Sequence, residues 1–373
     1  MASAHADRLG RAVNAIAGSG LDALIITPSA DLRYLLGVPL DPHACLSERL
    51  TCLVLRQRGG PVLVVPKLER PGYEHLGLDA LGVQLADWVD GEDPHVLVAK
   101  LLPRDPRAVA VADDMPARHV LGLHAAMPAT AQRLGSEVMR ELRMRKDPVE
   151  VDALRKAGAA IDRVHARMAE FAKPGRTEAE VGAEIAAAML AEGHSKASFI
   201  VVGSGPNGAS PHHELSGRVI EPGDIVVVDI GGPVPEGYFS DSTRTYCVGG
   251  EPSAEVRDTY AVLQHAQRTA VAAVRPGVTA EHVDATARKI IADAGFGEYF
   301  MHRTGHGIGL EVHEEPYIVA GNQLVLEPGM AFSVEPGIYL PQRWGARIED
   351  IVVVTEHGRE PLNSRPHELV SLP

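Results

Sequence analysis

Two pairs of segments in the second half of the chain repeat each other and constrain the fold more than any other feature. KPGRTEAEV (173–181) matches RPGVTAEHV (275–283), and VIEPGDIVVVDIG (219–231) matches VLEPGMAFSVEPG (325–337). In the first pair, Pro-Gly ends one helix and the threonine begins the next, with Thr177 and Glu180 spaced as a capping box. Because both matches occur in the same order and at similar separations, the sequence predicts a duplicated unit folded about a pseudo-twofold axis.

Acidic residues recur at the ends of the strands in both repeats. Asp229 and Glu335 occupy matching positions, each at the end of an apolar strand. A second acid follows on the next strand of each half, namely Asp241 and Glu349. A duplicated fold would bring both pairs to the axis. Four carboxylates that are close together and partly buried repel each other unless protons or cations neutralise them.

His306 can supply a fifth ligand for such cations. It lies in RTGHGIGL, where the flanking glycines allow another backbone to approach closely. Four carboxylates and one imidazole suit Mn²⁺ or Co²⁺ better than a structural thiolate zinc site. Two ions about 3.5–4 Å apart can share bridging carboxylates and activate a water molecule. Taken singly, Asp229 could instead cap a strand, and Glu349 could pair with Arg347 at the surface.

The other histidines divide into two groups. His212, in a Gly/Pro/Ser loop before the first hairpin, and His313, in GLEVHEEP, are expected to act in the site. For His213, His194 and His302, a structural and a functional role both remain open.

Length and composition fit two soluble domains. Residues 1–135 of the 373 are predicted to form an α/β domain with strands at 22–28, 50–56 and 61–66 and helices around 5–18, 67–76 and 117–126. Residues 136–373 are predicted to form the domain that carries the repeat, with a helix restarting at Pro148. The SADLRYLLG segment of the first domain reads as a helix start with Asp31 near its cap.

Charge, hydropathy and cysteine usage exclude several classes of protein. The net charge of −13 without a basic patch argues against a nucleic-acid partner. No apolar segment is long enough to span a membrane. Cys45, Cys52 and Cys247 show no CxxC spacing, which predicts a reducing, cytoplasmic location. The GxGxxG segment at 203–208 lacks the helix that a dinucleotide site requires.

Taken together, the segments DIGG, SDSTRT, HRTGHGIGLEVHE, FSVEPGIY and RIED resemble those of the dinuclear metallopeptidases with the pita-bread fold. That family includes Xaa-Pro dipeptidases (prolidases), aminopeptidase P, methionine aminopeptidases and the metal-free creatinases. The resemblance is strong from about residue 140 to 365, and the N-terminal domain is similar to that of prolidases and creatinases. It implies an α+β protein, with a pita-bread domain after a small α/β domain, acting as a homodimer.

The resemblance also implies roles for individual residues. Two divalent ions, Mn²⁺ first and Co²⁺ or Zn²⁺ as alternatives, would be held by the matching residues Asp229, Asp241, His306, Glu335 and Glu349. In the family the metals activate the water that attacks the scissile carbonyl, and the carboxylate matching Glu335 transfers the proton. His212, His313 and Arg347 match further residues of the family's catalytic site.

Within the family, an Xaa-Pro dipeptidase is the expected subfamily. A methionine aminopeptidase would usually lack the N-terminal domain, and a creatinase would lack the metal ligands. One departure concerns HEEPY, where Tyr317 stands in the place of an arginine that binds the dipeptide's carboxylate in many prolidases. We expect Tyr317, with His213 or His302, to hold that carboxylate. An aminopeptidase P acting on longer peptides and a metal-free binding scaffold remain the alternatives.

Overall fold

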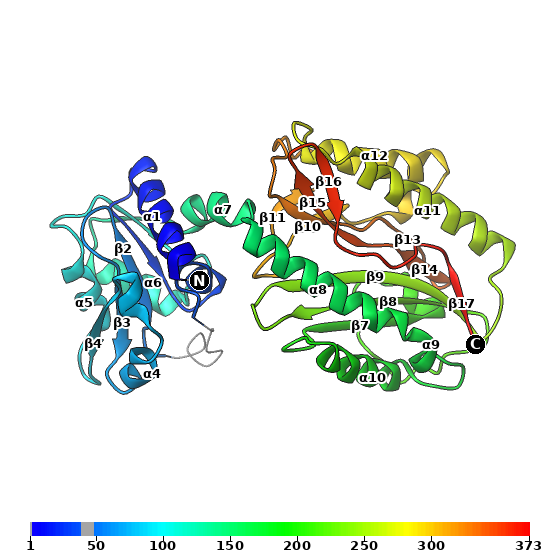
Figure 1. Ribbon diagram of the computed structural model, residues 1–373, viewed down its shortest axis with the longest axis horizontal. Coiled ribbons are helices and arrows are strands. Elements are labelled where there is room, and N and C mark those ends of the chain that lie inside the picture. The colour runs from blue at the N-terminus through cyan, green and yellow to red at the C-terminus, as the bar shows by residue number, and fades with distance from the viewer. Residues whose placement is uncertain (1, 39–47) are drawn as a thin grey trace. The chain divides into compact units, whose positions relative to one another are not determined.

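The computed structural model describes residues 2–38 and 48–373, so that Cys45 lies outside the described residues. The chain divides into two compact units, Met1–Arg143 and Met144–Pro373. The predicted division between residues 135 and 136 coincides with the start of helix α7 (Ser136–Met144), whereas the compact unit extends nearly to the end of that helix. Figure 1 shows the elements of each unit.

The first unit is built on a six-stranded mixed sheet, counted over the described residues, with the strand order β4-β3-β2-β1-β5-β6. Strands β1 to β3 pair antiparallel, and the other pairs are parallel. Its strands are β1 (Ala23–Ile26), β2 (Cys52–Arg56), β3 (Val62–Pro66), β4 (Gln84–Trp88), β5 (Ala108–Val111) and β6 (Ala131–Leu134). Its helices, besides α7, are α1 (Ala2–Gly18), α2 (Ala30–Leu36), α4 (Arg70–Glu74), η1 (Leu78–Leu81), α5 (Pro94–Leu101) and α6 (Ala117–Ala126).

The three strands predicted for this unit are confirmed as β1, β2 and β3, and helix α6 has the predicted bounds. Asp31 lies in the first turn of α2, with Ser29 as the N-cap. The predicted helix at 67–76 is wrong in its length, since α4 covers only Arg70–Glu74. Pro71 has no N–H and a fixed φ, which favours a helix beginning just before it. Strands β4, β5 and β6 were not predicted; β4 and β6 are partly polar edge strands that lack a continuous apolar run.

The second unit places strands between two groups of helices (Figure 1). The green helices α8 (Pro148–Ala166), α9 (Met168–Phe171) and α10 (Glu178–Ala191) lie on the opposite side of the strands from the yellow α11 (Ala254–Ala273) and α12 (Ala280–Asp293). Short 3₁₀ segments are η2 (Gly205–Ala209) and η3 (Gly297–Tyr299). The GxGxxG segment at 203–208 therefore runs into the 3₁₀ segment η2, where a dinucleotide site requires an α-helix.

Three sheets make up the centre of this unit. The first has the order β17-β9-β8-β7, the second β11-β10-β12-β15-β16, and the third is the hairpin β13-β14. Their bounds are β7 (Phe199–Ser204), β8 (Asp224–Pro233), β9 (Phe239–Val248), β10 (Gly305–Gly307), β11 (Glu314–Ile318), β12 (Ala331–Val334), β13 (Gly337–Leu340), β14 (Trp344–Arg347), β15 (Asp350–Thr355), β16 (Gly358–Pro361) and β17 (Val370–Leu372). The predicted succession of helices and β-hairpins is confirmed.

The predicted repeat appears in the backbone hydrogen bonds. Isolated bridges join Thr177 to Val219 in the first half and Thr279 to Val325 in the second, which are matching positions. Gly175 and Gly277 both have φ of 87°, and the N–H of each donates to a carbonyl of its own half at 2.9 Å. The capping box at Thr177 and Glu180 is present, and Thr279 caps α12.

Each half also has a hydrophobic core of its own. Residues of α8, α9 and α10 pack with one face of β8 and β9, including Val226, Val228 and Ile230. A separate cluster joins α11 and α12 to the second sheet. Because side chains alternate along a strand, Asp229 points away from the face of β8 that carries Val228 and Ile230. None of the described helices is long and apolar enough to cross a membrane.

Candidate metal and catalytic site

Acidic side chains from both halves converge on His306. The potential ligand atoms of Asp241, His306 and Glu349 all lie within 4.8 Å of one another. Nε2 of His306 is 3.2 Å from Oε1 of Glu335 and 3.5 Å from Oδ2 of Asp241. Asp229 is close enough that its charge raises the pKa of both Asp241 and Glu349. The structure therefore brings together all five residues predicted as metal ligands.

Local sequence explains how the backbone forms this cluster. Asp229 lies opposite Thr243 in the β8–β9 hairpin, and Gly231 lies opposite Asp241, so both acids are on one face of the hairpin. In the second half, Glu335 follows β12 and Glu349 precedes β15, which pair antiparallel. A Cβ atom on Gly305 would lie 1.8 Å from the carbonyl oxygen of Ser333, so the glycine before His306 is needed for close strand approach.

The chemistry of the cluster fits divalent cations. Burial, together with the neighbouring carboxylates, raises the pKa of Asp241 and of Glu349 well above their usual values. Burial also acts to raise the pKa of Glu335, but the hydrogen bond and charge of His306 outweigh it and bring that pKa to about 2. Oδ1 of Asp229 and Oε1 of Glu349 are buried and accept no hydrogen bond from the described residues. Two orphaned oxygens in a crowded acidic cluster are the acceptors that cations would satisfy.

Arg347 connects the carboxylates of the two halves. Its side chain is almost fully buried; Nη2 donates to Oδ2 of Asp229 at 2.6 Å, and Nε donates to Oγ1 of Thr243 at 3.0 Å. The Thr243 hydroxyl in turn donates to Oε2 of Glu349 at 2.7 Å. The arginine of the second half thus anchors an acid of the first, and the threonine of the first half anchors an acid of the second.

A second branch leads from Arg347 to His302. Nη1 of Arg347 donates to the hydroxyl oxygen of Tyr339 at 2.6 Å, so that this hydroxyl has its proton available for Nε2 of His302 at 2.9 Å. Nδ1 of His302 lies 2.7 Å from the carbonyl oxygen of Arg303, to which it can donate. Burial lowers the pKa of His302, in keeping with the neutral imidazole that these two contacts require. Both ring nitrogens are therefore engaged within the protein.

His313 lies beside the metal-ligand cluster. Its ring meets that of His306 edge-on, with centroids 4.1 Å apart. Burial, with the charges of His306 and Arg303, lowers the pKa of His313 to about 4. The ring is crowded by its neighbours, but the residue as a whole still reaches solvent, and no hydrogen bond engages its ring among the described residues. Its ring nitrogens are therefore available to contact a ligand bound at the cluster.

His212 and His213 lie on the same loop but have different surroundings. His212 is exposed, and the carbonyl oxygen of the preceding Pro211 lies 3.4 Å from both terminal nitrogens of Arg347. The loop that carries His212 is thereby fixed to the site. His213 instead places Nε2 2.7 Å from the buried carboxylate of Glu178. Glu178 also accepts hydrogen bonds from Ser204, Asn207 and Ser216, so His213 belongs to a structural hydrogen-bond network.

Tyr317 lies on β11, which pairs with the strand of His306. The guanidinium carbon of Arg303 is 4.5 Å from the centroid of the Tyr317 ring. His194 is buried away from the ligand residues, with Nε2 2.7 Å from the hydroxyl of Ser240. Tyr317, on the strand next to that of His306, thus contacts Arg303, whereas His194 contacts a side chain of β9.

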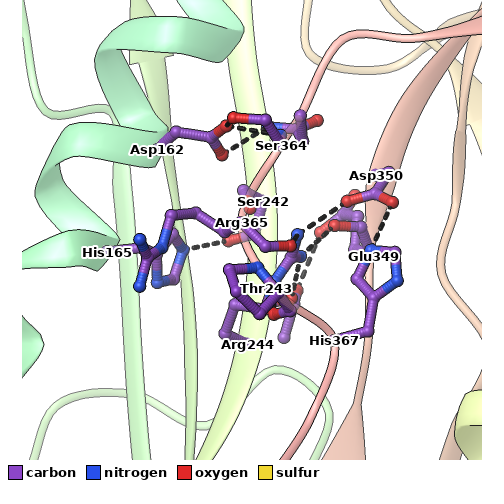
Figure 2. Close-up of polar contacts among 12 residues, drawn as sticks. Asp162, His165, Ser242, Thr243, Arg244, Glu349, Asp350, Ser364, Arg365 and His367 are labelled. Carbon is purple, nitrogen blue, oxygen red and sulfur yellow. Dashed lines mark hydrogen bonds and ion pairs between the residues drawn. The ribbon is translucent and has the colours of Figure 1, made fainter.

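The two acid-bearing strands are supported from the outer side. His165 of α8 lies with Nε2 3.1 Å from the carbonyl oxygen of Ser242, next to Asp241. Asp350, next to Glu349, accepts hydrogen bonds from Arg244 at 2.8 Å and from Gln267 at 3.2 Å, and lies 2.6 Å from His367. Figure 2 shows His165 on one side of Thr243 and Glu349, and Asp350 with His367 on the other.

Sequence reasoning missed Thr243, Tyr339 and Arg303. Thr243 could have been found, since it is two residues after Asp241 and therefore on the same face of a strand. Tyr339 and Arg303 carry no such signal. Their partners are 8 and 14 residues away in sequence and meet them only through the fold of the second half.

Comparisons with known proteins agree with this arrangement. Residues 152–356 match metallopeptidase family M24, and residues 8–145 match the creatinase/prolidase N-terminal domain. The chain is 58% identical to the probable dipeptidase PepE of Mycobacterium tuberculosis, covering 100% of this chain and 98% of that protein. It is 38% identical to an Xaa-Pro dipeptidase of Lactobacillus delbrueckii subsp. lactis, covering 95% and 96%. The crystal structure of dipeptidase PepE from Mycobacterium ulcerans superposes with a TM-score of 0.94 at 58% identity, covering 100% and 99%.

Proposed function

The chain belongs to metallopeptidase family M24, and we propose that it hydrolyses dipeptides at the bond before proline, using two divalent metal ions. The observation that carries the proposal is the convergence of Asp229, Asp241, His306, Glu335 and Glu349 with two orphaned carboxylate oxygens among them. The dipeptidases named among its relatives match the whole two-domain chain, which supports a dipeptide as substrate.

The five residues would hold the ions, with the carboxylates as oxygen ligands and His306 as the nitrogen ligand. When bound, divalent ions supply Lewis acidity toward the scissile carbonyl and lower the pKa of a water molecule. Manganese is the metal we propose, because four of the five ligands are hard oxygen donors.

Three side chains act on the substrate and its protons in this proposal. Glu335, which accepts a hydrogen bond from Ser333 at 2.9 Å, takes the proton from the attacking water and passes it to the leaving nitrogen. His313, with no hydrogen-bond partner among the described side chains, donates to the oxygen of the scissile carbonyl as negative charge develops there. His212, on the loop fixed by Arg347, contacts the substrate from the side of the first half.

A cleavage panel tests the proposal. Protein reconstituted with Mn²⁺ is assayed against Xaa-Pro dipeptides, Xaa-Pro-Xaa tripeptides and peptides that begin with methionine. We expect the highest kcat/KM for Xaa-Pro dipeptides. Preferential removal of N-terminal methionine, or no hydrolysis of any peptide by metal-loaded protein, would contradict it.

One observation favours aminopeptidase P as a second candidate. Tyr317 stands where many prolidases have the arginine that binds the substrate's carboxylate, and a tyrosine offers one neutral donor in place of two charged ones. If tripeptides are cleaved at least as well as dipeptides in the panel, this second candidate replaces the first.

Three finer features are part of the same proposal. Elemental analysis of the reconstituted protein should give two metal ions per chain. Light scattering should give the mass of a homodimer, as the resemblance implies. Cell fractionation should recover the protein in the cytoplasm, where the thiols of Cys52 and Cys247, both buried and free, would stay reduced.

A further inference from the structure

Arg303 is a partly buried cation that lies over an aromatic ring. Among the described residues, no hydrogen bond or ion pair involves its guanidinium. The group instead lies over the ring of Tyr317, at 4.5 Å from the centroid. A guanidinium has five N–H donors, and in a protein with a net charge of −13 an anionic partner is the usual arrangement. Its donors therefore remain available to a ligand.

The backbone on both sides of Arg303 is firmly held. The carbonyl oxygen of Arg303 lies 2.7 Å from Nδ1 of His302, and the next residue, Thr304, gives both its N–H and its hydroxyl to Asp284, at 3.2 and 2.8 Å. The N–H of Thr304 also bonds to Ile318, next to Tyr317. A fixed backbone and an aromatic platform pre-organise the guanidinium, which reduces the entropy that a ligand contact must overcome.

The same segment leads directly into the metal-ligand cluster. His306 is three residues beyond Arg303, and the ring of His313 packs edge-on against it. The charge of Arg303 is near enough to His313 to contribute to its electrostatics. Arg303, His313 and Tyr317 therefore lie together beside the cluster.

The other side chains considered for a carboxylate contact are already occupied. His213 is paired with Glu178, and both ring nitrogens of His302 are engaged. Arg347 is buried between Asp229 and Thr243. Among the cations near the cluster in the described part of the chain, Arg303 alone has its charge unpaired.

We propose that Arg303, stacked on Tyr317, binds the C-terminal carboxylate of the substrate and thereby sets the preference for dipeptides. This assignment rests on the proposed peptidase function. A guanidinium can accept a carboxylate through two parallel, charge-assisted hydrogen bonds, which a tyrosine hydroxyl cannot. A third residue in the substrate moves the carboxylate away and leaves a neutral amide facing the guanidinium. Arg303 is accordingly a specificity-determining residue, and Tyr317 positions it.

The test compares free acids with amides. Wild type and Arg303→Gln, both loaded with Mn²⁺, are assayed with Ala-Pro and Leu-Pro and with the C-terminal amide of each. We expect Arg303→Gln to raise KM for the free acids about 10- to 100-fold, the range for loss of a charged hydrogen-bond pair, with kcat changed little. The amides should be cleaved equally by both proteins. An equal effect on acids and amides, or no effect, would overturn the assignment.

Further variants separate the guanidinium from its platform. Tyr317→Leu should raise KM for the acids by a factor of about 2–5, and Tyr317→Phe, which keeps the ring, should raise it less. A loss in Tyr317→Phe equal to that in Arg303→Gln would assign the carboxylate to the tyrosine hydroxyl instead. Arg268→Gln, which removes an exposed arginine of α11, is the matched control and should change nothing.

The inference and the proposed function can fail separately. If wild type hydrolyses neither acids nor amides, the proposed function fails. Calorimetric binding of Ala-Pro and of its amide to wild type and Arg303→Gln then decides the inference by itself. If the wild type binds Ala-Pro more tightly than Arg303→Gln does, the assignment to Arg303 is supported. If both proteins bind Ala-Pro equally, the assignment is rejected.

Discussion

The two halves of the second unit share a backbone plan but contribute different chemistry. Each half supplies a capped helix, an antiparallel strand pair and two acids, with matching bridges at Thr177 and Thr279. The segments that lead to the site differ. In the second half, Thr304 leads to His306 among the carboxylates, whereas in the first half the segment after β7 presents His212 from an exposed loop. The two halves thus share the positions of the acids, while their histidines lie at different positions.

The halves also depend on each other for anchoring their acids. Asp229 is held by Arg347, and Glu349 is held by Thr243, so each half supports an acid of the other half. The two halves resemble each other in their backbone. They depend on each other through side-chain contacts across the axis. Substitutions can test each aspect in turn.

The largest effect is expected from removing one acid in each half. Asp241→Ala and Glu349→Ala should each lower kcat/KM by more than about 10³-fold, beyond the loss that follows removal of a single hydrogen-bond donor. Bound metal should fall in both variants, while far-UV circular dichroism stays unchanged. Glu356→Ala, an exposed acid at the end of β15, is the control. Full metal content and activity in either variant would break the equivalence of the halves.

The next effect concerns the two histidines that differ between the halves. His212→Ala and His313→Ala should each lower kcat by about 10²–10⁴-fold, the range for loss of a proton-transfer or oxyanion partner. Metal content should stay near normal, as in the exposed control His357→Ala. Loss of metal from His313→Ala would place that residue among the ligands.

The anchoring across the axis can be tested at Thr243. Thr243→Val leaves Oε2 of Glu349 and Nε of Arg347 without their shared partner. We expect metal affinity, measured by competition with a fluorescent chelator, to fall about 10- to 100-fold. Thr245→Val is the matched control, because the hydroxyl of that buried threonine hydrogen-bonds, among the described residues, with the backbone of Arg347 and with no carboxylate. Similar affinity in both variants would show that the hydroxyl of Thr243 does not orient the ligand.

A smaller effect separates the two buried acids that support the site segments. Glu178 accepts from Ser204 and lies against His213, whereas Asp284 accepts from Thr304 and Arg288. Glu178→Gln and Asp284→Asn should each reduce the free energy of unfolding by about 1–3 kcal/mol, the cost of leaving buried donors unsatisfied. Asp284→Asn should weaken metal binding through the segment of His306, and Glu178→Gln should not. Equal metal affinity in both variants would contradict this division.

The smallest effect on stability at neutral pH is expected from replacing His165, which contacts β9 of the first half. The matching residue in the second half is Gln267, which contacts Asp350 and does not titrate. Burial lowers the pKa of His165 to about 3. Below pH 6.5 the unfolded chain binds a proton there that the folded chain does not. Stability should therefore fall as pH falls, by about 1.4 kcal/mol per pH unit from this group.

Urea unfolding of wild type and His165→Gln from pH 7.5 to 5 measures this slope. The difference in unfolding free energy between the two proteins should shift in favour of the variant as the pH falls. The exposed His357→Gln provides the control and should track wild type. A constant difference across this range would mean that His165 is protonated, or unprotonated, equally in both states.

Much of the second unit could be derived from the sequence because its signals are local. The Pro-Gly and threonine caps, the alternation along β8 and β9 and the glycines around His306 are each set by neighbouring residues. The repeat then required matching acids to approach a common axis. The polar edge strands β4 and β6 carry no such local signal. They are strands because they pair with the inner strands β3 and β5, and not because of their own hydropathy.

The sequence by itself determined which carboxylates and which imidazole could assemble, because a duplicated pattern fixes matching positions in both halves. Only the tertiary structure decided how they are held and what remains free. His213 and His302, both considered for the substrate, are engaged by Glu178 and Tyr339. Arg303 lies over the ring of Tyr317 and has no anionic partner in the part of the chain that the structure describes. These outcomes depend on side chains that meet across the fold, and the pairing of such side chains leaves no periodic trace in the sequence.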